Sequence, residues 1–452
     1  MPRGLARCGV LASGRCDDLA GRERSLAGGR ADGQSWGVRW CSGIFLVGFL
    51  LAVSRGQAAG PWPSVEGALA GELKLFSQVP NFTLPWKVTL SPAPDGGQAF
   101  SFILDGAGAR VQAAGQVDLA TGNGSWRIDE ARIDAAVWFA ACAPRLAPAF
   151  SGMTAQGTVT VAGSGILRQG QPVGRVRVTW RDGSLQQAEQ GWTLAGIAFS
   201  GEFELDGTAA RPVSTAPFEL TVQTITTTRF GARNGFVNAR LNEQGALSVT
   251  AARVEIAGGE VTTDPFEAPL SPLMVNALLR ISRVGLQDIV LLVPAAGLDD
   301  ARGRIDGVVR LKWDKALGIQ LGVGHLAIRD DEPAIVRLTP APGLLTGHVP
   351  QYFDLLPTWL GPLSRWARQV DPAYGNMQSV ELGQSELRVK TLDVLLTPEG
   401  DERGRSATVR LVAQPTMPDS VVKEVTFDVN VAGPLNAVLK LGIDQKFTLG
   451  VH

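Results

Sequence analysis

The sequence predicts a mainly β protein whose strands each carry one apolar face. Between residues 150 and 330, short runs alternate strictly between apolar and polar residues, which is typical of half-buried strands. Gly, Asp and Asn residues break these runs and supply turns, and the chain contains 54 Gly. Helical patterns are short and rare between the runs. These observations favour many short strands with a few short helices.

The apolar positions of the alternating runs predict a continuous apolar surface. Sixteen of them form the candidate binding site: Val176, Val178, Trp180, Ile197, Phe199, Phe203, Leu205, Phe218, Leu220, Val222, Leu247, Val249, Val309, Leu311, Ile319 and Leu321. The intervening positions are mostly polar, for example Arg175, Arg177, Glu202, Glu204, Glu219 and Thr221, and we expect them on the opposite face.

Residues 1–59 are expected to form an N-terminal extension and a signal peptide or anchor. An apolar run at residues 41–53 follows Arg39 and precedes small residues. A membrane-spanning helix needs about 20 apolar residues, so this shorter run favours a secretory signal, with cleavage after Ala58 or Ala59. A retained N-terminal anchor is the alternative. In either case the remaining chain is expected to be exported and to face water.

The exported chain divides into four predicted segments. Residues 60–150 are expected to form an N-terminal lead-in and a first β segment. Residues 61–98 are Pro-rich and irregular with one strand near Lys87–Leu90, short strands follow from residue 99 to 134, and a short helix or apolar plug ends at Pro144. Residues 151–345 form the main β segment, in which a helix over Leu286–Val293 follows a strand ending near Val284. Residues 378–452 return to strands.

Residues 346–377 are predicted to be an amphipathic helical insertion. Apolar residues recur at helical spacing between 350 and 370, although Pro357 and Pro362 must kink or split such a helix. This stretch contains Trp359, Trp366 and two Arg residues. It fits an interfacial helix at a membrane, a cap over the apolar surface, or plain core packing.

Composition argues against nucleic-acid binding and against disorder. The 42 Lys and Arg residues nearly balance the 43 Asp and Glu residues, so the chain lacks the basic character of a nucleic-acid-binding protein. An apolar content of 45% is enough for a large buried surface.

Catalysis is not expected, and neither is a metal or a cofactor. The three His residues are far apart in sequence, and the nucleophile-elbow, phosphate-loop and dinucleotide motifs do not occur. Acidic pairs at Asp299-Asp300 and Asp330-Asp331-Glu332 could in principle serve glycoside hydrolysis. Both clusters sit in turn-like contexts, which favours solvated loop charge.

The chain resembles the YdbH family of bacterial envelope proteins, within the wider AsmA-like group that includes TamB. The residues that carry the resemblance are 286–311, with the pattern D-x-x-G-R-I-D-G, the segment that follows them, and the closing blocks 385–415 and 427–441. The resemblance implies an elongated, curled antiparallel sheet that forms a U-shaped β-groove. It also implies a periplasmic protein that carries phospholipids between inner and outer membrane, with a small outer-membrane lipoprotein as partner.

A trough lined with Val, Leu, Ile and Phe suits acyl chains, because burying each CH2 group contributes about 0.8 kcal/mol. About twenty strands at roughly 4.8 Å spacing give a groove on the order of 100 Å long. The family has also been labelled as dicarboxylate transport, but one short apolar segment cannot build a pathway through a bilayer. The alternatives are an envelope assembly protein that aids outer-membrane β-barrel biogenesis, a secreted β-solenoid enzyme, and an ordinary β-protein core.

Overall fold

A computed structural model describes most of the chain after residue 65. The described residues are 66–73, 82–94, 97–146, 152–189, 191–206, 212–228, 230–270, 272–292, 297–314, 318–355, 359, 368–402, 404–417 and 420–432. All of them belong to one compact unit, Gly37–His452. The predicted extension, signal peptide or anchor at residues 1–59 lies outside the described residues.

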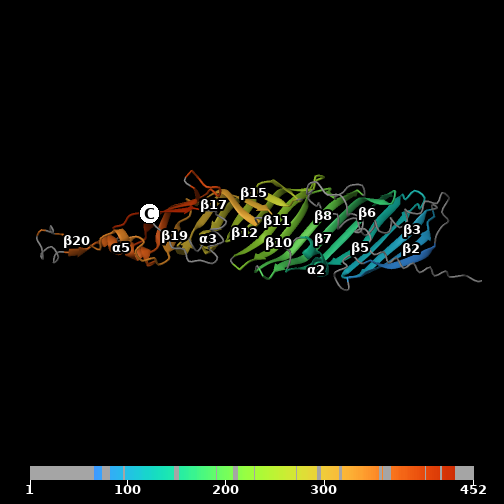
Figure 1. The fold of residues 1–452 in the computed structure, drawn as a ribbon, viewed down its shortest axis with the longest axis horizontal. Helices are drawn as coiled ribbons and strands as arrows, with labels where there is room; N and C mark the ends of the chain where they lie inside the picture. Colours follow the sequence, from blue (N-terminus) through green and yellow to red (C-terminus); the bar gives the residue numbers. More distant parts are fainter. Residues whose placement is uncertain are drawn as a thin grey trace, which may run out of the picture. The chain divides into compact units, whose positions relative to one another are not determined.

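Twenty-two strands of this unit form one sheet (Figure 1). They are β1 Gly67–Leu73, β2 Leu84–Pro92, β3 Gln98–Gly106, β4 Ala109–Val117, β5 Gly124–Asp134, β6 Met153–Arg168, β7 Gln171–Gln187, β8 Trp192–Asp206, β9 Val213–Ser214, β10 Phe218–Thr226, β11 Gly231–Leu241, β12 Ala246–Ile256, β13 Gly259–Thr263, β14 Phe266–Pro269, β15 Met274–Gly285, β16 Leu298–Arg302, β17 Arg304–Asp314, β18 Gly318–Ile328, β19 Ala334–Leu338, β22 Leu387–Leu396, β23 Arg405–Pro415 and β24 Val425–Ala432. A separate hairpin pairs β20 Tyr352–Asp354 with β21 Arg368–Val370.

The strands follow one another along the sheet almost in chain order, and every pairing is antiparallel. β1 to β8 pair in sequence, β8 pairs with β10, and the series continues through β11, β12, β15, β17, β18, β22, β23 and β24, with β13 and β14 between β12 and β15. Within the described residues, β1 pairs only with β2 and β24 only with β23. The sheet is therefore open, and the predicted fold class is confirmed.

Two-residue turns connect several neighbouring strands. Ala107-Gly108, Gln169-Gly170 and Ala257-Gly258 each have positive φ at both positions. Two positive φ values define the mirror-image turn that matches the twist of paired strands, and Gly adopts such a φ without strain. The Gly-rich breaks in the sequence therefore act as hairpin turns.

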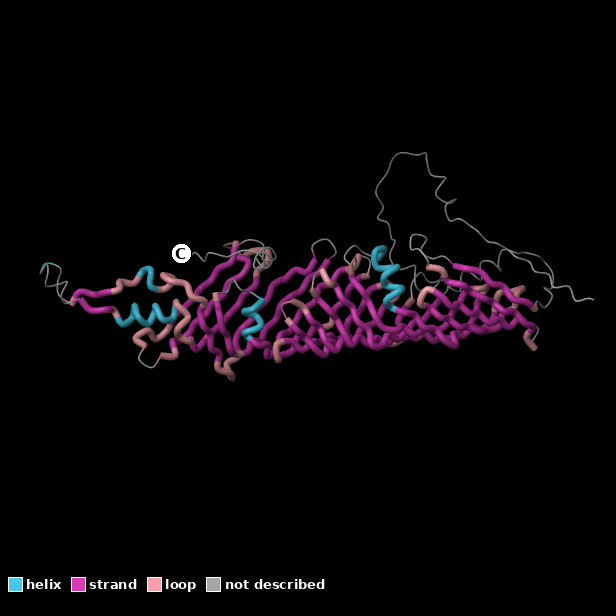
Figure 2. Tube along the Cα trace, turned by 90° about the horizontal axis from the view of Figure 1, so that it is seen from below, coloured by secondary structure: helices cyan, strands magenta, loops and turns pink. Residues whose placement is uncertain are grey.

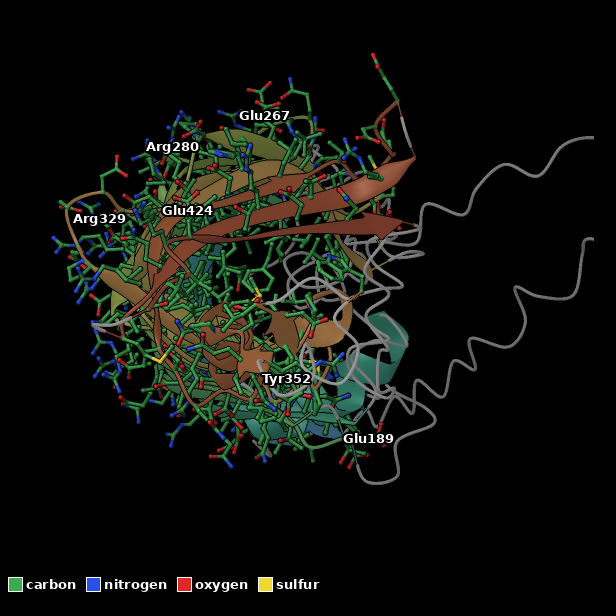
Figure 3. The ribbon with its side chains drawn as sticks, turned by 90° about the vertical axis from the view of Figure 1, so that its left-hand side faces the viewer. Glu189, Glu267, Arg280, Arg329, Tyr352 and Glu424 are labelled. Atoms are coloured by element: carbon green, nitrogen blue, oxygen red, sulfur yellow. The ribbon has the colours of Figure 1, made fainter. Side chains whose placement is uncertain are left out.

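Register shifts interrupt many of the strand pairs. Examples lie between Ile128 and Arg132 in the β5–β6 pair and between Trp180 and Gly183 in the β7–β8 pair. Each shift of this kind bends the strand and increases its twist. Repeated along the sheet, these bulges account for its curvature, which Figure 3 shows from one end.

Among the described residues, three short α-helices accompany the sheet; Figure 2 shows where helices lie along it. They are α2 Ala135–Leu146, α3 Leu286–Leu292 and α5 Pro372–Glu381, and a 3-10 turn, η4, spans Thr346–His348. α2 and α3 confirm the two predicted helices. α2 runs two residues past the expected end at Pro144.

Two sequence-based expectations are wrong. Residues 61–98 are predicted from the sequence to be irregular apart from a strand near Lys87–Leu90; β2 contains that strand, but β1 is a further strand in this segment. The described ends of the 350–370 stretch, Tyr352–Asp354 and Arg368–Val370, are extended and not helical. Tyr352 and Phe353 are aromatic residues, which favour strands, and Pro357 and Pro362 between the two ends disfavour a continuous helix. A helix, α5, begins at Pro372, where the Asp371 side chain accepts a hydrogen bond from the Ala373 N–H.

The predicted segment boundaries fall within continuous parts of the sheet. β5 pairs with β6 across residue 150, and β18 pairs with β22 across residues 346–377. The segments on either side of these boundaries therefore belong to one sheet, and the division into domains stays a prediction.

Buried apolar residues gather at both ends of the sheet. Near β1 to β5, Leu84 and Leu104 form a cluster that α2 covers, with Trp138 packed edge-on against Phe82 at 5.3 Å between ring centroids. Near the other end, Val290 of α3 and Val380 of α5 pack with strands β15 to β24 around Leu387. These two clusters hold the ends of the sheet in a defined conformation.

Candidate functional site: the apolar face of the sheet

The strand register places the predicted site residues on one face of the sheet, which we call the apolar face. Across β7, β8 and β10, Trp180 pairs with Phe199, and Phe199 pairs with Leu220. Directly paired residues point to the same side, and side chains alternate along each strand. The pairs that connect the other members are Val176 with Phe203, Ile197 with Val222, Ala239 with both Phe218 and Val249, Leu241 with Leu247, Leu311 with Leu321, and Trp313 with Ile319.

The opposite face is polar, as the alternation predicts. Arg175 pairs with Glu204, and Arg177 pairs with Glu202, with 3.3 Å between the Arg177 guanidinium and the Glu202 carboxylate. In Figure 3 the sheet curves around an interior filled with side chains, and Glu267, Arg280 and Arg329 lie on its outer side. Arg280 lies between Leu279 and Ile281 of the apolar face along β15. The apolar face is therefore the concave one.

Burial of the apolar face is uneven along the sheet. Its ends are covered by the two clusters described above, but between β8 and β12 the apolar side chains are mostly only half-buried. Of the described site residues, Val176, Ile197, Val249 and Val309 are buried, and the other eleven are intermediate. The structure describes the backbone of Ile319 but not its side-chain burial. A row of half-buried apolar residues marks a surface available to an apolar ligand.

An aromatic cluster lies in this half-buried stretch. The ring of Phe199 is 5.4 Å from that of Phe218 and 6.4 Å from that of Phe203, centroid to centroid. Gly201 lies beneath all three rings, and a Cβ atom at this position would come within 3.0 Å of each Phe side chain. Only Gly permits this approach, so the sequence FSGEF builds an aromatic patch on the concave side.

Sequence reasoning missed part of the apolar face. Phe100, Phe102 and Trp126 on the first strands, and Leu392 and Leu411 on the last ones, occupy equivalent positions by register. The same alternation of apolar and polar residues could have identified them. Val237 and Ala239 of β11 also lie on this face, next to the apolar residue Phe236, which lies on the opposite face.

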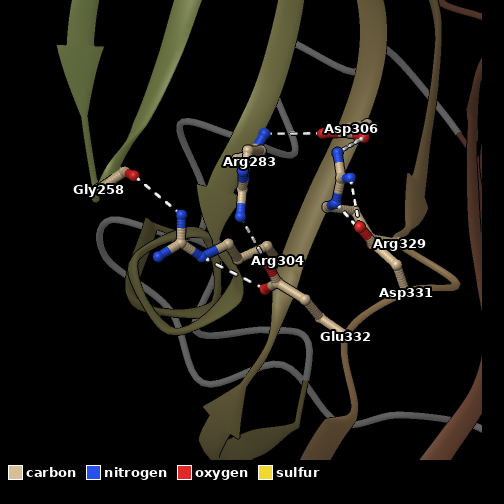
Figure 4. A network of polar contacts seen from close by, with 7 residues as sticks. All are labelled: Gly258, Arg283, Arg304, Asp306, Arg329, Asp331 and Glu332. Carbon is tan, nitrogen blue, oxygen red and sulfur yellow. Dashed lines mark hydrogen bonds and ion pairs between the residues drawn. The ribbon is translucent and has the colours of Figure 1, made fainter.

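The acidic clusters are engaged in ion pairs (Figure 4). Glu332 contacts Arg283 at 2.9 Å and Arg304 at 3.4 Å, and Arg329 bridges Asp306 and Asp331 at 2.6 and 2.7 Å. The Asp306 carboxylate also accepts a hydrogen bond from the Arg283 N–H, at a bulge where Arg283 has positive φ.

These contacts give the D-x-x-G-R-I-D-G pattern a structural role. Arg304 and Asp306 of the pattern connect the turn at Gly258, the bulge in β15 and the end of β18. The prediction of a turn-like context is wrong for Asp299 and Asp300, which lie in β16 and pair with Arg337 and Arg302.

The ion pairs predict a modest acid sensitivity. The hydrogen bond from Arg329 lowers the pKa of Asp331 below its ordinary value near 4, although partial desolvation opposes this shift. The contribution to stability is therefore complete above about pH 4 and is lost as the pH falls through the lowered folded-state value. We expect Asp331→Asn to lower the melting temperature slightly at pH 7 and by less below pH 4, so that the fall in melting temperature towards acid pH becomes shallower. An unchanged acid limb in calorimetry would contradict this assignment.

The described residues do not supply an obvious site for metal chemistry. Among them, no group of three or more His, Cys, Asp or Glu residues is placed to hold a metal ion. His325 lies on β18 with Nε2 3.4 Å from the Asp393 carboxylate. No described helix is both long enough and apolar enough to cross a membrane.

An open antiparallel sheet with one apolar and one charged face defines a class of protein in which the sheet itself offers the binding surface. Within this class, the chain belongs to the YdbH-like family, described as intermembrane phospholipid transport protein YdbH. The family's sequence model matches residues 65–346, more than half of the chain. The searches of curated proteins and of solved structures found no match. Family membership supports phospholipid and membrane involvement and a place in the cell envelope.

The family match confirms the resemblance, with different limits from those expected. It extends from residue 65 through the segment 286–311 that carried the resemblance, and it ends before the closing blocks at 385–415 and 427–441. The resemblance of those closing blocks stays a prediction.

Proposed function

We propose that the apolar face is a phospholipid-binding β-groove through which this protein moves lipid between the inner and outer membranes. The observation that carries the proposal is the half-buried apolar stretch between β8 and β12. Phospholipid tails would lie along this stretch with their head groups towards solvent. The charged outer face would keep the protein soluble in the periplasm, the compartment that we propose for it.

The surface suits sliding chains better than a single fixed ligand. Val, Leu and Phe side chains continue from strand to strand, and the register leaves few polar residues on this face between β7 and β12. Each buried CH2 group contributes about 0.8 kcal/mol, whichever strand it contacts. Acyl chains can therefore shift along the sheet at nearly constant free energy.

The family match favours phospholipid transport over the alternative of an assembly protein for outer-membrane β-barrels. The small outer-membrane lipoprotein stays a predicted partner. That the protein has no enzymatic activity also stays a proposal.

Native mass spectrometry with lipid extraction tests the proposal. We expect the full-length protein, purified without harsh detergent, to carry phospholipid mass adducts, and the extract to contain both acyl chains and head groups. A folded, monodisperse protein that carries no lipid and takes up none from vesicles would contradict it.

A further inference from the structure

The hairpin of β20 and β21 lies at the end of the sheet next to α5 (Figures 1 and 2). It exposes large apolar side chains. All six of its strand residues are exposed. The exposed fractions of its apolar residues, with those of its two described neighbours, are 47% for Tyr352, 39% for Phe353, 58% for Leu355, 80% for Trp359 and 53% for Val370. A two-stranded hairpin is at best marginally stable in water, so this one gains from a surface that covers it.

Both ends of the hairpin are held firmly. The Asp371 N–H donates to the Gln351 carbonyl at 3.0 Å, which closes the base of the hairpin, and Asp371 also caps α5. At the other end of α5, Glu381 is buried and accepts hydrogen bonds from Leu345 and Thr346. The turn and η4, which precede the hairpin, and the helix that follows it are therefore held together, so the exposed side chains are presented from a defined base.

The exposed residues have the chemistry of a membrane interface. Trp and Tyr prefer the boundary between head groups and acyl chains, because an apolar ring and a polar group can each find their own environment. The charged residues of the two strands, Asp354 and Arg368, neutralise each other at 2.7 Å. This pairing lowers the cost of bringing the hairpin into the head-group region, where one unpaired carboxylate would be unfavourable.

We infer that the β20–β21 hairpin docks this end of the protein onto a phospholipid bilayer by inserting Tyr352, Phe353 and Trp359 into the interface. The inference rests on the proposed function, since a lipid carrier must meet the membranes that it serves. Side chains that pack on a folded protein partner need a matched surface, whereas the fluid interface accepts aromatic residues on both sides of a hairpin.

A polarity-sensitive fluorophore at position 359 tests the inference. The full-length protein, with its four native Cys residues changed to Ser, receives Trp359→Cys and is labelled there. Val421→Cys is the matched control, because Val421 is also an exposed apolar residue, at 60%, but lies outside the hairpin. With vesicles of phosphatidylethanolamine and phosphatidylglycerol, we expect a blue shift and a several-fold intensity rise at 359 and neither at 421. If the emission wavelength and intensity of the label at 359 do not change with vesicles, the inference is overturned and a protein partner is favoured for these residues.

Charged substitutions in the hairpin test bilayer docking separately from lipid binding by the apolar face. We expect Phe353→Asp with Trp359→Asp to weaken vesicle binding about tenfold or more, since the double substitution removes two apolar rings from the interface and adds two charges. Lipid bound to the purified protein should stay unchanged. Vesicle binding that is insensitive to the double substitution overturns the inference and leaves the proposed function intact. All variants share the same N-terminal apolar run, so any difference belongs to the hairpin.

Discussion

Changing Phe199, Phe203 and Phe218 together to Asp should leave a folded protein that purifies without phospholipid. The three rings form the aromatic patch over Gly201 and lie in the half-buried stretch of the apolar face. An ionised carboxylate in contact with an acyl chain loses hydration without gaining a partner, which costs several kcal/mol per group. Three such groups on adjacent strands would exclude lipid from this part of the face, and we expect at least a roughly tenfold loss of extracted phospholipid.

The matched control puts the same charges on the other face of the same strands. Ala198 and Ser200 are exposed on β8, and Thr221 of β10 pairs directly with Ala198. Changing these three residues to Asp should leave the lipid content near that of the unmodified protein. Circular dichroism and thermal melting must show both variants folded. Equal lipid loss in the two variants would mean that net charge, and not the apolar face, governs binding.

Glu381→Ala should strongly destabilise the folded protein. The carboxylate is buried at 2% exposure and accepts hydrogen bonds from the Leu345 N–H, the Thr346 N–H and the Thr346 hydroxyl, at 2.7–3.0 Å. Removing it leaves three donors without their acceptor in a part-buried turn, and we expect a loss of about 3 kcal/mol in the free energy of unfolding. Urea denaturation measures this loss.

A conservative variant and a pH series test the same contact. Burial raises the pKa of Glu381. Hydrogen bonds from Thr346 and from the backbone of Leu345 and Gly343 together lower this pKa by more than burial raises it, so the net shift is downward. Its contribution is thus complete above about pH 4.5 and is lost as the pH falls through the depressed folded-state value. Glu381→Gln keeps an acceptor and should cost less than Glu381→Ala. Glu399, at 92% side-chain exposure, serves as control, and its change to Ala should cost nearly nothing. Equal losses at both positions would contradict the buried role of Glu381.

Local sequence pattern predicted the fold because each strand carries its own signal. Period-two alternation fixes which residues share a face, and Gly-containing turns fix where one strand ends and the next begins. For that reason the alternating residues noted in the sequence lie in β7, β8, β10 and β17, and the helix expected over Leu286–Val293 corresponds to α3. All of the described site residues lie on one face, as the alternation requires.

The exposure of that face could not be predicted from the pattern. Phe203 would show the same alternation in an ordinary sandwich core, because the signal reports which side a residue faces and not what covers it. Whether a second layer covers the face depends on long-range packing, as in the clusters that α2 and α5 complete at the two ends. The role of Glu381 was also invisible, since its partners at Leu345 and Thr346 lie more than thirty residues away.

The hairpin shows a different limit of sequence reasoning. Apolar residues between 350 and 370 recur at a spacing that a helix would bring together, yet Tyr352–Asp354 and Arg368–Val370 pair as strands. Periodicity alone does not decide between helix and strand when Pro residues divide the segment.

Site-specific photo-crosslinking along β8 tests most directly whether the apolar face binds lipid. A photoreactive residue is placed in turn at positions 197 to 205 of the full-length protein, and covalent phospholipid adducts are measured by mass spectrometry. If the apolar face binds lipid, the adducts will have a period of two, strong at positions 197, 199, 203 and 205 and weak at 198, 200, 202 and 204. Equal adducts at both sets, or adducts confined to the charged set, would contradict a lipid-binding apolar face.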